Sequence, residues 1–430
     1  MKTSVFLISV LTLVGSPFIC QSRQEFTPKQ VLGQVGGPYA DLDRHAVEAP
    51  ELVTSSLERL TAYLIRPART DDERIRAIYR WVTHNIAYDA GRLAGGVIFN
   101  VRAPEVLKHR QALCGGYASL IEAMASAAGI ETEVVIGHSR GYDYAGQFPE
   151  GQEILHAWNA VKINGQWMLL DATWGSGYLD ESGVFVRAFR EHYFLTPPEQ
   201  FLYDHWPRES TWQIVDFPIS RKEYNRRVRL APAFFDYGLQ VGSHARSIVQ
   251  VDKITEITIF SPGGVDLASQ LLKNGQPKDE TFTFDQRDDQ YYKIHIKLNR
   301  AGEHTLRVFA RYIQDDVEQF DWVAEYTIVS KSSTFGATGF PQRSISFMER
   351  QVYLETPMSG YLNSGENYPF KVRAPAAADV AIVIGESWTH LTKNGDWYTG
   401  DVTAEKGEIA LCARYEDKEE YAVMLVYQGL

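Results

Sequence analysis

A single cysteine at the predicted start of a helix is the feature that most constrains this chain. The run Leu113-Cys114-Gly115-Gly116-Tyr117-Ala118 precedes apolar residues at helical spacing, and Gly129 is a natural stop for that helix. A thiol in the first turn faces unpaired backbone N–H groups and the positive end of the helix dipole, and both favour the nucleophilic thiolate. The alternative interpretation is a buried core cysteine, and the sequence downstream argues against it.

A predicted β-hairpin downstream carries a candidate base and a candidate carboxylate. Residues 156–163 have a strand pattern, Asn164-Gly165 is the strongest short hairpin signal, and residues 166–174 are the predicted return strand. If the turn has two residues, His156 lies opposite Thr173 and Asp171 lies opposite Trp158. Because side chains alternate between faces, we expect all four on one face of the sheet.

In this register His156 and Asp171 are diagonal neighbours, about 7–8 Å apart at the backbone and within side-chain reach. A carboxylate at that position can hold the imidazole in one tautomer, ready to accept a proton from a thiol. The pattern therefore predicts a Cys-His-Asp set with cysteine as the nucleophile.

These motifs together resemble the transglutaminase-like superfamily. They are, in chain order, Cys114-Gly-Gly-Tyr-Ala, His156-Ala-Trp-Asn, Gly165-Gln-Trp167 and Asp171-Ala-Thr-Trp174. Residues 78–82 and 85–89 are similar to the same family, and residues 193–199 resemble its kyphoscoliosis-peptidase-like branch. The resemblance covers about residues 70–215. It implies a papain-like α+β fold and acyl transfer through a thioester, but it leaves the substrate open because the superfamily includes transglutaminases, peptidases, amidases and inactive scaffolds.

Each member of the set receives an expected role. Cys114 attacks a carboxamide or peptide carbonyl, His156 activates the thiol and protonates the leaving amine, and Asp171 orients His156. The backbone N–H of Cys114 is expected to help hold the oxyanion. Four further residues are expected to bind substrate or support the site: Gly115, Tyr117, Trp158 and Trp174. On the hairpin register, Trp174 should point away from His156.

For this predicted enzyme, hydrolysis of amide or peptide bonds is favoured slightly over protein cross-linking. Two other functions are kept as alternatives. One is a catalytically silent transglutaminase-like binding or scaffold protein. The other is a serine hydrolase, because Gly137-His138-Ser139-Arg140-Gly141 matches G-x-S-x-G. That motif needs a helix directly after the serine, and the sequence continues as a predicted loop, so we give Ser139 the lowest weight.

The first 22 residues have the pattern of an export signal. Lys2 precedes an apolar core, Val5 to Val14, which is shorter than the roughly 20 residues that span a bilayer. We therefore expect an exported protein, which is periplasmic, secreted or surface-associated. Acylation at Cys20 would make it a lipoprotein, although Ile19 stands where a small residue is expected. After removal of the signal, only Cys114 and Cys412 remain, which are too few for a disulfide framework. Cys412 has the pattern of a core strand residue.

Composition and charge limit the classes of molecule that this protein is expected to bind. The net charge of −11 and the absence of a basic patch argue against nucleic acid, so a protein or peptide substrate is expected. The histidines are scattered without paired cysteines, so no metal and no cofactor are predicted. An apolar content of 44% supports well-buried cores.

The organisation along the chain predicts an α+β papain/transglutaminase-like domain over residues 23–230, followed by two immunoglobulin-like β-sandwich modules over 231–333 and 334–430. Helices are expected over residues 51–65, after a capping box at Thr70 to Glu73, and over 105–109. A sheet should contain residues 132–137, the hairpin and residues 191–195.

Two pairs of similar segments, here called sequence echoes, suggest that the sandwich is repeated. They are Leu272-Lys-Asn-Gly275 with Thr392-Lys-Asn-Gly395, and residues 302–312 with 407–415. Residues 330–341 are the predicted linker between the copies. A cell-surface or envelope partner is expected to contact these C-terminal modules.

Overall fold

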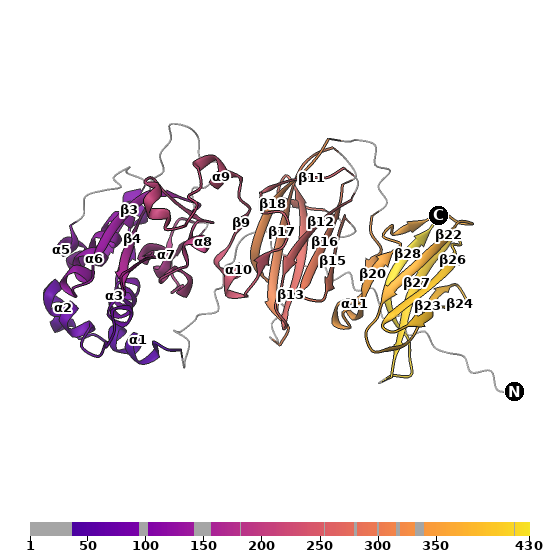
Figure 1. Ribbon diagram of the computed structural model, residues 1–430, viewed down its shortest axis with the longest axis horizontal. Coiled ribbons are helices and arrows are strands. Elements are labelled where there is room, and N and C mark those ends of the chain that lie inside the picture. The colour runs from indigo at the N-terminus through magenta and orange to yellow at the C-terminus, as the bar shows by residue number, and fades with distance from the viewer. Residues whose placement is uncertain are drawn as a thin grey trace. The chain divides into compact units, whose positions relative to one another are not determined.

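A computed structural model describes residues 37–93, 102–141, 156–180, 182–252, 254–278, 282–298, 301–314, 319–331, 339–416 and 418–430 (Figure 1). The predicted export signal at residues 1–22, including Cys20, lies outside this description and stays a prediction. The described residues divide into two compact units, the first ending at Arg227 and the second running from Val228 to Leu430. Among the helices of the described residues, none is both long and apolar enough to cross a membrane.

The first unit packs a group of helices against a small antiparallel sheet. Its helical segments are α1 (Ala40–Val47), η1 (Glu51–Ser55), α2 (Leu57–Leu64), α3 (Asp71–Asn85), α4 (Ala90–Leu93), α5 (Ala103–His109), α6 (Cys114–Ala127), α7 (Ala172–Ser176), η2 (Glu191–Tyr193), α8 (Pro198–Phe201), η3 (Ser210–Gln213) and α9 (Arg221–Arg226). Its strands are β1 (Ala87–Tyr88), β2 (Gln111–Ala112), β3 (Thr132–Ser139), β4 (His156–Ile163), β5 (Gln166–Leu170), β6 (Gly177–Leu179), β7 (Phe185–Arg187) and β8 (His205–Pro207).

Local signals explain where the helices begin. The helix expected over residues 51–65 is two segments, because Ser56 has extended backbone angles and its hydroxyl caps α2 by accepting a hydrogen bond from the Arg59 N–H. Thr70 caps α3 as predicted, accepting from the Glu73 N–H. The apolar face of α3 is buried as its spacing predicts.

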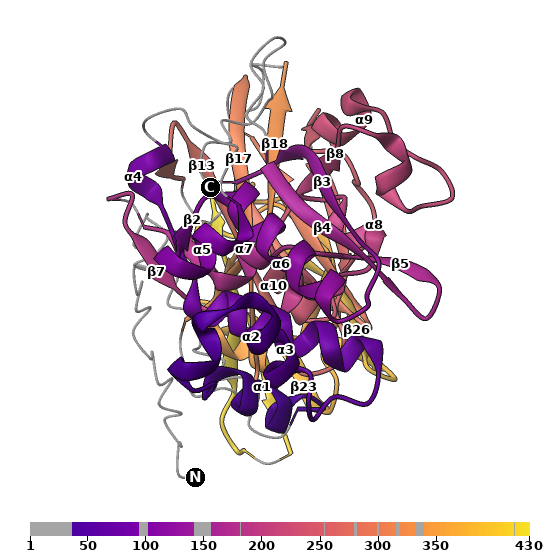
Figure 2. The same ribbon diagram turned by 90° about the vertical axis from the view of Figure 1, so that its left-hand side faces the viewer.

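The sheet has the strand order β5-β4-β3-β8, and α6 packs against β4 and β3 (Figures 1 and 2). The strand beside β3 is β8, and residues 191–195, predicted to form a strand of this sheet, do not form one. That predicted segment is instead a single 3-10 turn, η2, followed by an isolated bridge between Thr196 and Leu169. This arrangement brings the N-terminus of α6 next to the start of β4.

The second unit contains two β-sandwiches of the same topology, so the expected fold class, α+β followed by two sandwich modules, is confirmed. Its first sandwich has the strands β9 (Arg229–Leu230), β10 (Gln240–Val241), β11 (Ile248–Gln250), β12 (Ile254–Phe260), β13 (Val265–Lys273), β14 (Gln276–Pro277), β15 (Thr283–Asp288), β16 (Tyr291–Lys297), β17 (Gly302–Tyr312) and β18 (Asp321–Ser330), with helix α10 (Pro232–Asp236). One sheet has the order β10-β12-β16-β15 and the other β11-β18-β17-β13-β14, with β9 paired to β18.

The second sandwich repeats that order with later strands. Its strands are β19 (Gln342–Arg343), β20 (Tyr353–Thr356), β21 (Tyr361–Leu362), β22 (Asn367–Arg373), β23 (Ala377–Ile384), β24 (Ser387–His390), β25 (Thr392–Asn394), β26 (Trp397–Thr403), β27 (Gly407–Tyr415) and β28 (Ala422–Gly429), with helix α11 (Ile345–Glu349). Its sheets have the orders β20-β22-β26-β25 and β19-β28-β27-β23-β24, with β21 paired to β28.

Only one of the two sequence echoes marks an equivalent position. Residues 302–312 and 407–415 form β17 and β27, which occupy matching places in their sheets. Asn274-Gly275, however, turns β13 into β14, whereas Asn394-Gly395 turns β25 into β26. The match of Leu272–Gly275 with Thr392–Gly395 was therefore wrong as a repeat marker, because both segments are hairpin turns with the same chemistry at different places in the sandwich.

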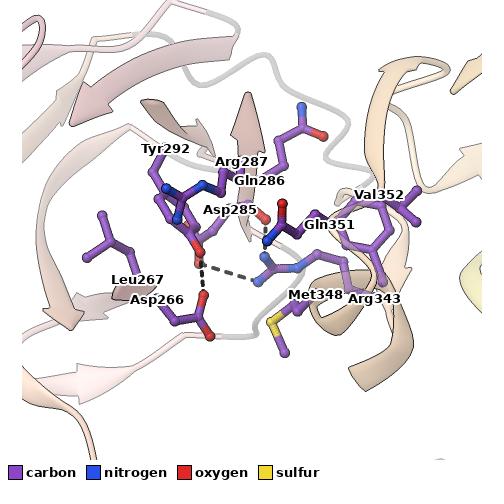
Figure 3. A pocket seen from close by; sticks show the side chains of 11 residues that line it. Asp266, Leu267, Asp285, Gln286, Arg287, Tyr292, Arg343, Met348, Gln351 and Val352 are labelled. Carbon is purple, nitrogen blue, oxygen red and sulfur yellow. Dashed lines mark hydrogen bonds and ion pairs between the residues drawn. The ribbon is translucent and has the colours of Figure 1, made fainter. Parts of the chain in front are cut away.

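A polar pocket lies where α11 and β19 of the second sandwich approach β13, β15 and β16 of the first (Figure 3). Asp285 is buried there and accepts hydrogen bonds from the Ser269 N–H and hydroxyl, while Arg343 lies 3.4 Å from its carboxylate. Beside the pocket, the Gln286 side chain donates to the Leu354 carbonyl and accepts from the Leu354 N–H. These contacts tie the two sandwiches together within the second unit.

Candidate active site

Cys114 is the first residue of α6 and is almost fully buried, with 4% of its surface exposed. Leu113 provides the N-cap without a side-chain hydrogen bond, so the N-terminal N–H groups of the helix are not capped by the preceding side chain. The cysteine packs beside Ala118 of its own helix and Ala157 of β4. Its thiol is free, as the predicted nucleophile requires.

His156 and Asp171 are in direct contact, as predicted. The Nε2 atom of His156 lies 2.7 Å from Oδ2 of Asp171, and both side chains are buried. His156 also interacts with the Cys114 thiol, and this interaction lowers the pKa of the thiol and raises that of the imidazole. Because Nε2 faces the carboxylate, Nδ1 is the ring nitrogen left for the thiol. The structure thus brings the three predicted residues together in the order Cys114, His156, Asp171.

The hairpin register is correct only as far as Leu170. Asn159 pairs with Leu170 and Ile163 pairs with Gln166, as the two-residue turn predicts. After Leu170 the chain leaves the strand and enters α7, so neither Asp171 nor Thr173 has the predicted partner on β4. Asp171 reaches His156 as the N-cap of α7, where its Oδ1 accepts from the N–H groups of Thr173 and Trp174, at 2.7 and 3.0 Å.

The same turn changes the position of Trp174. On a strand it would face away from His156, but on α7 its ring centroid lies 5.4 Å from that of His156, so this prediction was wrong. The ring centroid of Trp158 lies 6.0 Å from that of His156. A Cβ on Gly137 would come within 2.6 Å of the Trp158 ring, so the glycine on β3 makes room for this tryptophan. Two indole rings therefore enclose the imidazole.

The other two predicted supporting residues lie on α6. Gly115 is half-buried in its first turn, next to Cys114. Tyr117 is 1% exposed, and its hydroxyl donates to the Ile86 carbonyl at 2.7 Å. Tyr117 thus anchors α6 to the end of α3, and a role in substrate contact is not supported by this burial.

The charges of the site favour an ion pair. Burial raises the pKa of the Cys114 thiol, but the hydrogen bond and charge of His156 lower it, with a backbone hydrogen bond at Ala157, and the net effect is a pKa below the usual value. Burial lowers the pKa of His156, but the charge and hydrogen bond of Asp171 raise it to about 10. At neutral pH these shifts favour thiolate and imidazolium, the reactive state of a cysteine nucleophile.

Three residues outside the predicted Cys-His-Asp set extend the cluster: His205, Asp204 and Tyr193. His205, the first residue of β8, lies with Nε2 3.1 Å from Oδ2 of Asp171 and Nδ1 2.6 Å from Oδ1 of Asp204. Tyr193 in turn donates its hydroxyl to Asp204 at 3.0 Å. His205 is separated from Asp171 by 34 positions in a segment without periodicity, and only the pairing of β8 with β3 brings it into the site.

The site residues His156, Asp171 and His205 also have potential metal-ligand atoms within 4.8 Å of one another. Their separations of 2.7 and 3.1 Å are hydrogen-bond distances, and a metal would have to replace both bonds. It would also take the imidazole of His156 away from the thiol. We therefore treat the cluster as a hydrogen-bonded chain and assign no metal to it.

The remaining candidates lack the necessary surroundings. Ser139 is the last residue of β3 and pairs with His205 across the sheet, and the two described residues that follow it, Arg140 and Gly141, do not begin a helix as a serine nucleophile requires. Cys412 is buried in β27, where burial raises its pKa to about 12. That thiol is an inert core residue, as the strand pattern predicts.

A papain-like α+β unit with Cys, His and Asp in this order defines a transglutaminase-like domain. Residues 58–172 match the Transglutaminase-like superfamily, and residues 221–336 match the KY-like, immunoglobulin-like domain. This chain carries a transglutaminase-like domain of the kyphoscoliosis-peptidase-like branch.

Two curated relatives illustrate that membership. The chain is 32% identical over 279 residues to Kyphoscoliosis peptidase of Mus musculus, covering 64% of this chain and 41% of the relative. It is 26% identical over 251 residues to Hillarin of Drosophila melanogaster, covering 54% of this chain and 30% of that protein. The chain thus spans about two fifths or less of the length of these relatives.

A solved structure titled as a putative cysteine protease from Cytophaga hutchinsonii is 19% identical. The match covers 36% of this chain and 47% of that one, with a TM-score of 0.23, which is too low to support an inference.

Proposed function

We propose that this protein is a cysteine-dependent acyl-transfer enzyme that acts on amide or peptide bonds. The observation that carries the proposal is the hydrogen bond between His156 and Asp171, with the Cys114 thiol, whose pKa His156 lowers, at the start of α6. Each neighbour has the chemistry that its role needs: a base beside the thiol, and a carboxylate that fixes the tautomer of the base.

The reaction proceeds in two halves. The Cys114 thiolate attacks the substrate carbonyl carbon, and the backbone N–H of Cys114 donates to the developing oxyanion. The C–N bond then breaks, the leaving amine takes the proton of His156, and the acyl group remains on sulfur as a thioester. Water or an amine next attacks that thioester, His156 takes its proton, and the C–S bond breaks to restore the thiolate. Water gives hydrolysis, and an amine gives transfer or cross-linking.

Hydrolysis is the favoured outcome. The name of the mouse relative, Kyphoscoliosis peptidase, points in the same direction, although the chain spans only 41% of that protein. Water is available to any thioester that solvent can reach, whereas cross-linking needs a second subsite for the amine. The substrate we propose is a protein or peptide.

The experiment is a comparison of wild-type protein with Cys114→Ala, His156→Ala and Ser139→Ala. Turnover of a peptide library, followed by mass spectrometry, should be lost in the first two variants and kept in Ser139→Ala. Circular dichroism checks that each variant is folded. Turnover that persists in Cys114→Ala and disappears in Ser139→Ala would assign the reaction to the serine.

A catalytically silent transglutaminase-like scaffold is the second candidate, because only 4% of the Cys114 surface is exposed to solvent and substrate. The two are separated by a thiol-reactive probe on the native protein. An enzyme should label at Cys114 faster than a free cysteine at the same pH, whereas in a scaffold Cys114 should label no faster.

A further inference from the structure

We propose that His205, anchored by Asp204, is a positioning residue that holds Asp171 against His156. The inference rests on the proposed function, since it gives His205 a part in a reaction at Cys114. It concerns a residue that lies beyond the predicted Cys-His-Asp set, hydrogen-bonds Asp171 and has its ring centroid 5.4 Å from that of His156.

Hydrogen-bond chemistry fixes the protons of His205. Its ring is completely buried between the carboxylates of Asp171 and Asp204, with one nitrogen facing each at 3.1 and 2.6 Å. A carboxylate only accepts hydrogen bonds, so both ring nitrogens donate and the ring carries a positive charge. Burial raises the pKa of Asp171, but the charge and hydrogen bond of His156, followed by those of His205, hold it well below its usual value. His205 is therefore a buried cation between two anions.

The contact with His205 completes the partners of Asp171. Oδ1 of Asp171 accepts from two backbone N–H groups of α7, and Oδ2 accepts from His156 and from His205. All four donors come from elements that are fixed independently: α7, β4 and β8. If His205 were removed, Oδ1 would stay bonded to α7, but Oδ2 would lose one of its two side-chain partners and be held against His156 less firmly.

Aromatic rings enclose the His205 cation. Phe201 stacks on it with ring centroids 4.0 Å apart and an interplanar angle of 21°, and Trp174 and Trp158 follow at 4.5 and 5.0 Å. Such faces attract a cation and exclude water, which strengthens the bonds to both carboxylates. The same cage offers the competing explanation, in which His205 is only an aromatic filler of the core.

The charge of His205 predicts a direction for the pH profile of Cys114. Its replacement by a neutral residue leaves the site one charge more negative, so Cys114 and His156 hold their protons to higher pH. The other titratable or charged groups around His205 and Asp171 are not substituted in these variants. They are Tyr79, Arg190, His192, Tyr193 and Asp204. The alkylation midpoint of Cys114 should therefore move towards alkaline pH.

Two substitutions separate positioning from filling. His205→Phe keeps an aromatic ring of similar shape against Phe201 but removes both hydrogen bonds. His205→Gln loses the ring but retains an N–H donor that can reach Asp171. His138→Phe is the matched control, since His138 is also buried, lies on the adjacent strand β3, pairs with Trp206 and alternates to the other face of the sheet.

The measurement is the rate of iodoacetamide alkylation of Cys114 against pH, read by peptide mass spectrometry, with circular dichroism as a folding check. We expect both His205 variants to shift the midpoint by about one pH unit to the alkaline side, so that alkylation at pH 6 falls about tenfold. The limiting rate at high pH should be better preserved in His205→Gln than in His205→Phe. His138→Phe should keep the wild-type profile.

Three outcomes would decide against the proposal or its foundation. A folded His205→Phe protein with the wild-type midpoint would show that the ring only fills space. A higher limiting alkylation rate of Cys114 in His205→Phe than in His205→Gln would also show that the ring only fills space. An unreactive Cys114 in the wild-type protein would instead overturn the proposed function, and this result is separate from the other two. If His205→Phe fails to fold, His205→Gln alone still tests the shift of the midpoint.

Discussion

The two buried thiols of this chain are expected to behave as opposites. His156 lowers the pKa of Cys114, whereas burial without such a partner raises that of Cys412 to about 12. Alkylation of the native protein from pH 5 to pH 9 should modify Cys114 with a midpoint well below the free value of about 8.5 and leave Cys412 untouched. Peptide mass spectrometry measures both sites in one sample. Equal labelling, or labelling of Cys114 only after denaturation, would contradict the nucleophile assignment.

The carboxylate of Asp171 can be tested without removing its structural contact. Asparagine is an equally good N-cap, so Asp171→Asn should keep the hydrogen bonds to the Thr173 and Trp174 N–H groups and preserve the fold. Its amide N–H₂ can face His156 and select the wrong tautomer, which should lower the turnover rate by a factor on the order of 10³ to 10⁴.

Asp180→Asn is the matched control for that substitution, because Asp180 also accepts from nearby backbone N–H groups, those of Ser182 and Val184, in a turn outside the site. Steady-state kinetics on the three proteins give the comparison. Loss of turnover in both variants, or in neither, would remove Asp171 from the reaction.

Among the elements, the helix of Cys114 and the hairpin were accessible to prediction because their signals are local. Apolar spacing and Gly129 delimit α6, and Asn164-Gly165 sets a register that holds from Asn159 with Leu170 to Ile163 with Gln166. The return strand was extended too far because Asp171 was interpreted as a strand residue. An aspartate before a short polar run is also an N-cap signal, and that second meaning was the correct one.

His205 was missed for a different reason. Its only sequence context is the short run Tyr203 to Pro207, which has neither helical nor strand periodicity. Its importance comes from the pairing of Ser139 with His205, a contact between strands that are far apart in the chain. No local pattern reports such a contact, so only the three-dimensional fold reveals the second half of the hydrogen-bonded chain.

A packing test at the level of the sheet follows from Gly137 on β3. A Cβ there would lie 2.3 Å from the Trp206 carbonyl oxygen and 2.6 Å from the Trp158 ring, and the backbone cannot yield easily. Gly137→Ala should therefore lower the free energy of unfolding of the first unit by about 1–3 kcal/mol and displace Trp158 from His156.

The control for Gly137 is Gly91→Ala in the same unit, where the nearest atom, Oδ1 of Asp89, would lie at an ordinary 3.7 Å. Urea unfolding of the two variants supplies the free energies. The close approach would be unimportant if Gly137→Ala were as stable as Gly91→Ala.

At the scale of the whole molecule, the repeat of the sandwich could be predicted from the sequence. Of the two pairs of similar segments used to predict it, only one marks equivalent positions. The echo of β17 in β27 reflects a shared topology, whereas the Asn-Gly turns match by chemistry alone. Both sandwiches carry edge strands and loops, and Cys412, buried in β27, has no part in the proposed reaction. We therefore expect the second unit to engage a large substrate or a partner, while the reaction belongs to the first.

Truncation at the boundary between the units tests whether the first unit carries the reaction and the second binds the substrate or partner. The first compact unit ends at Arg227, and Cys114, His156, Asp171 and His205 all lie within it. A chain that stops there should retain reactivity towards a small thiol probe, because no hydrogen bond described for these four side chains comes from beyond Arg227.

The same truncation should weaken turnover of a macromolecular substrate, since the surface that holds it would be gone. A paired assay of full-length and truncated protein, with circular dichroism to establish that the first unit remains folded, measures both activities. If a folded truncation lost its reactivity towards the small probe, the sandwiches would have to complete the active site. If it kept full activity on the macromolecule, they would have no role in substrate binding.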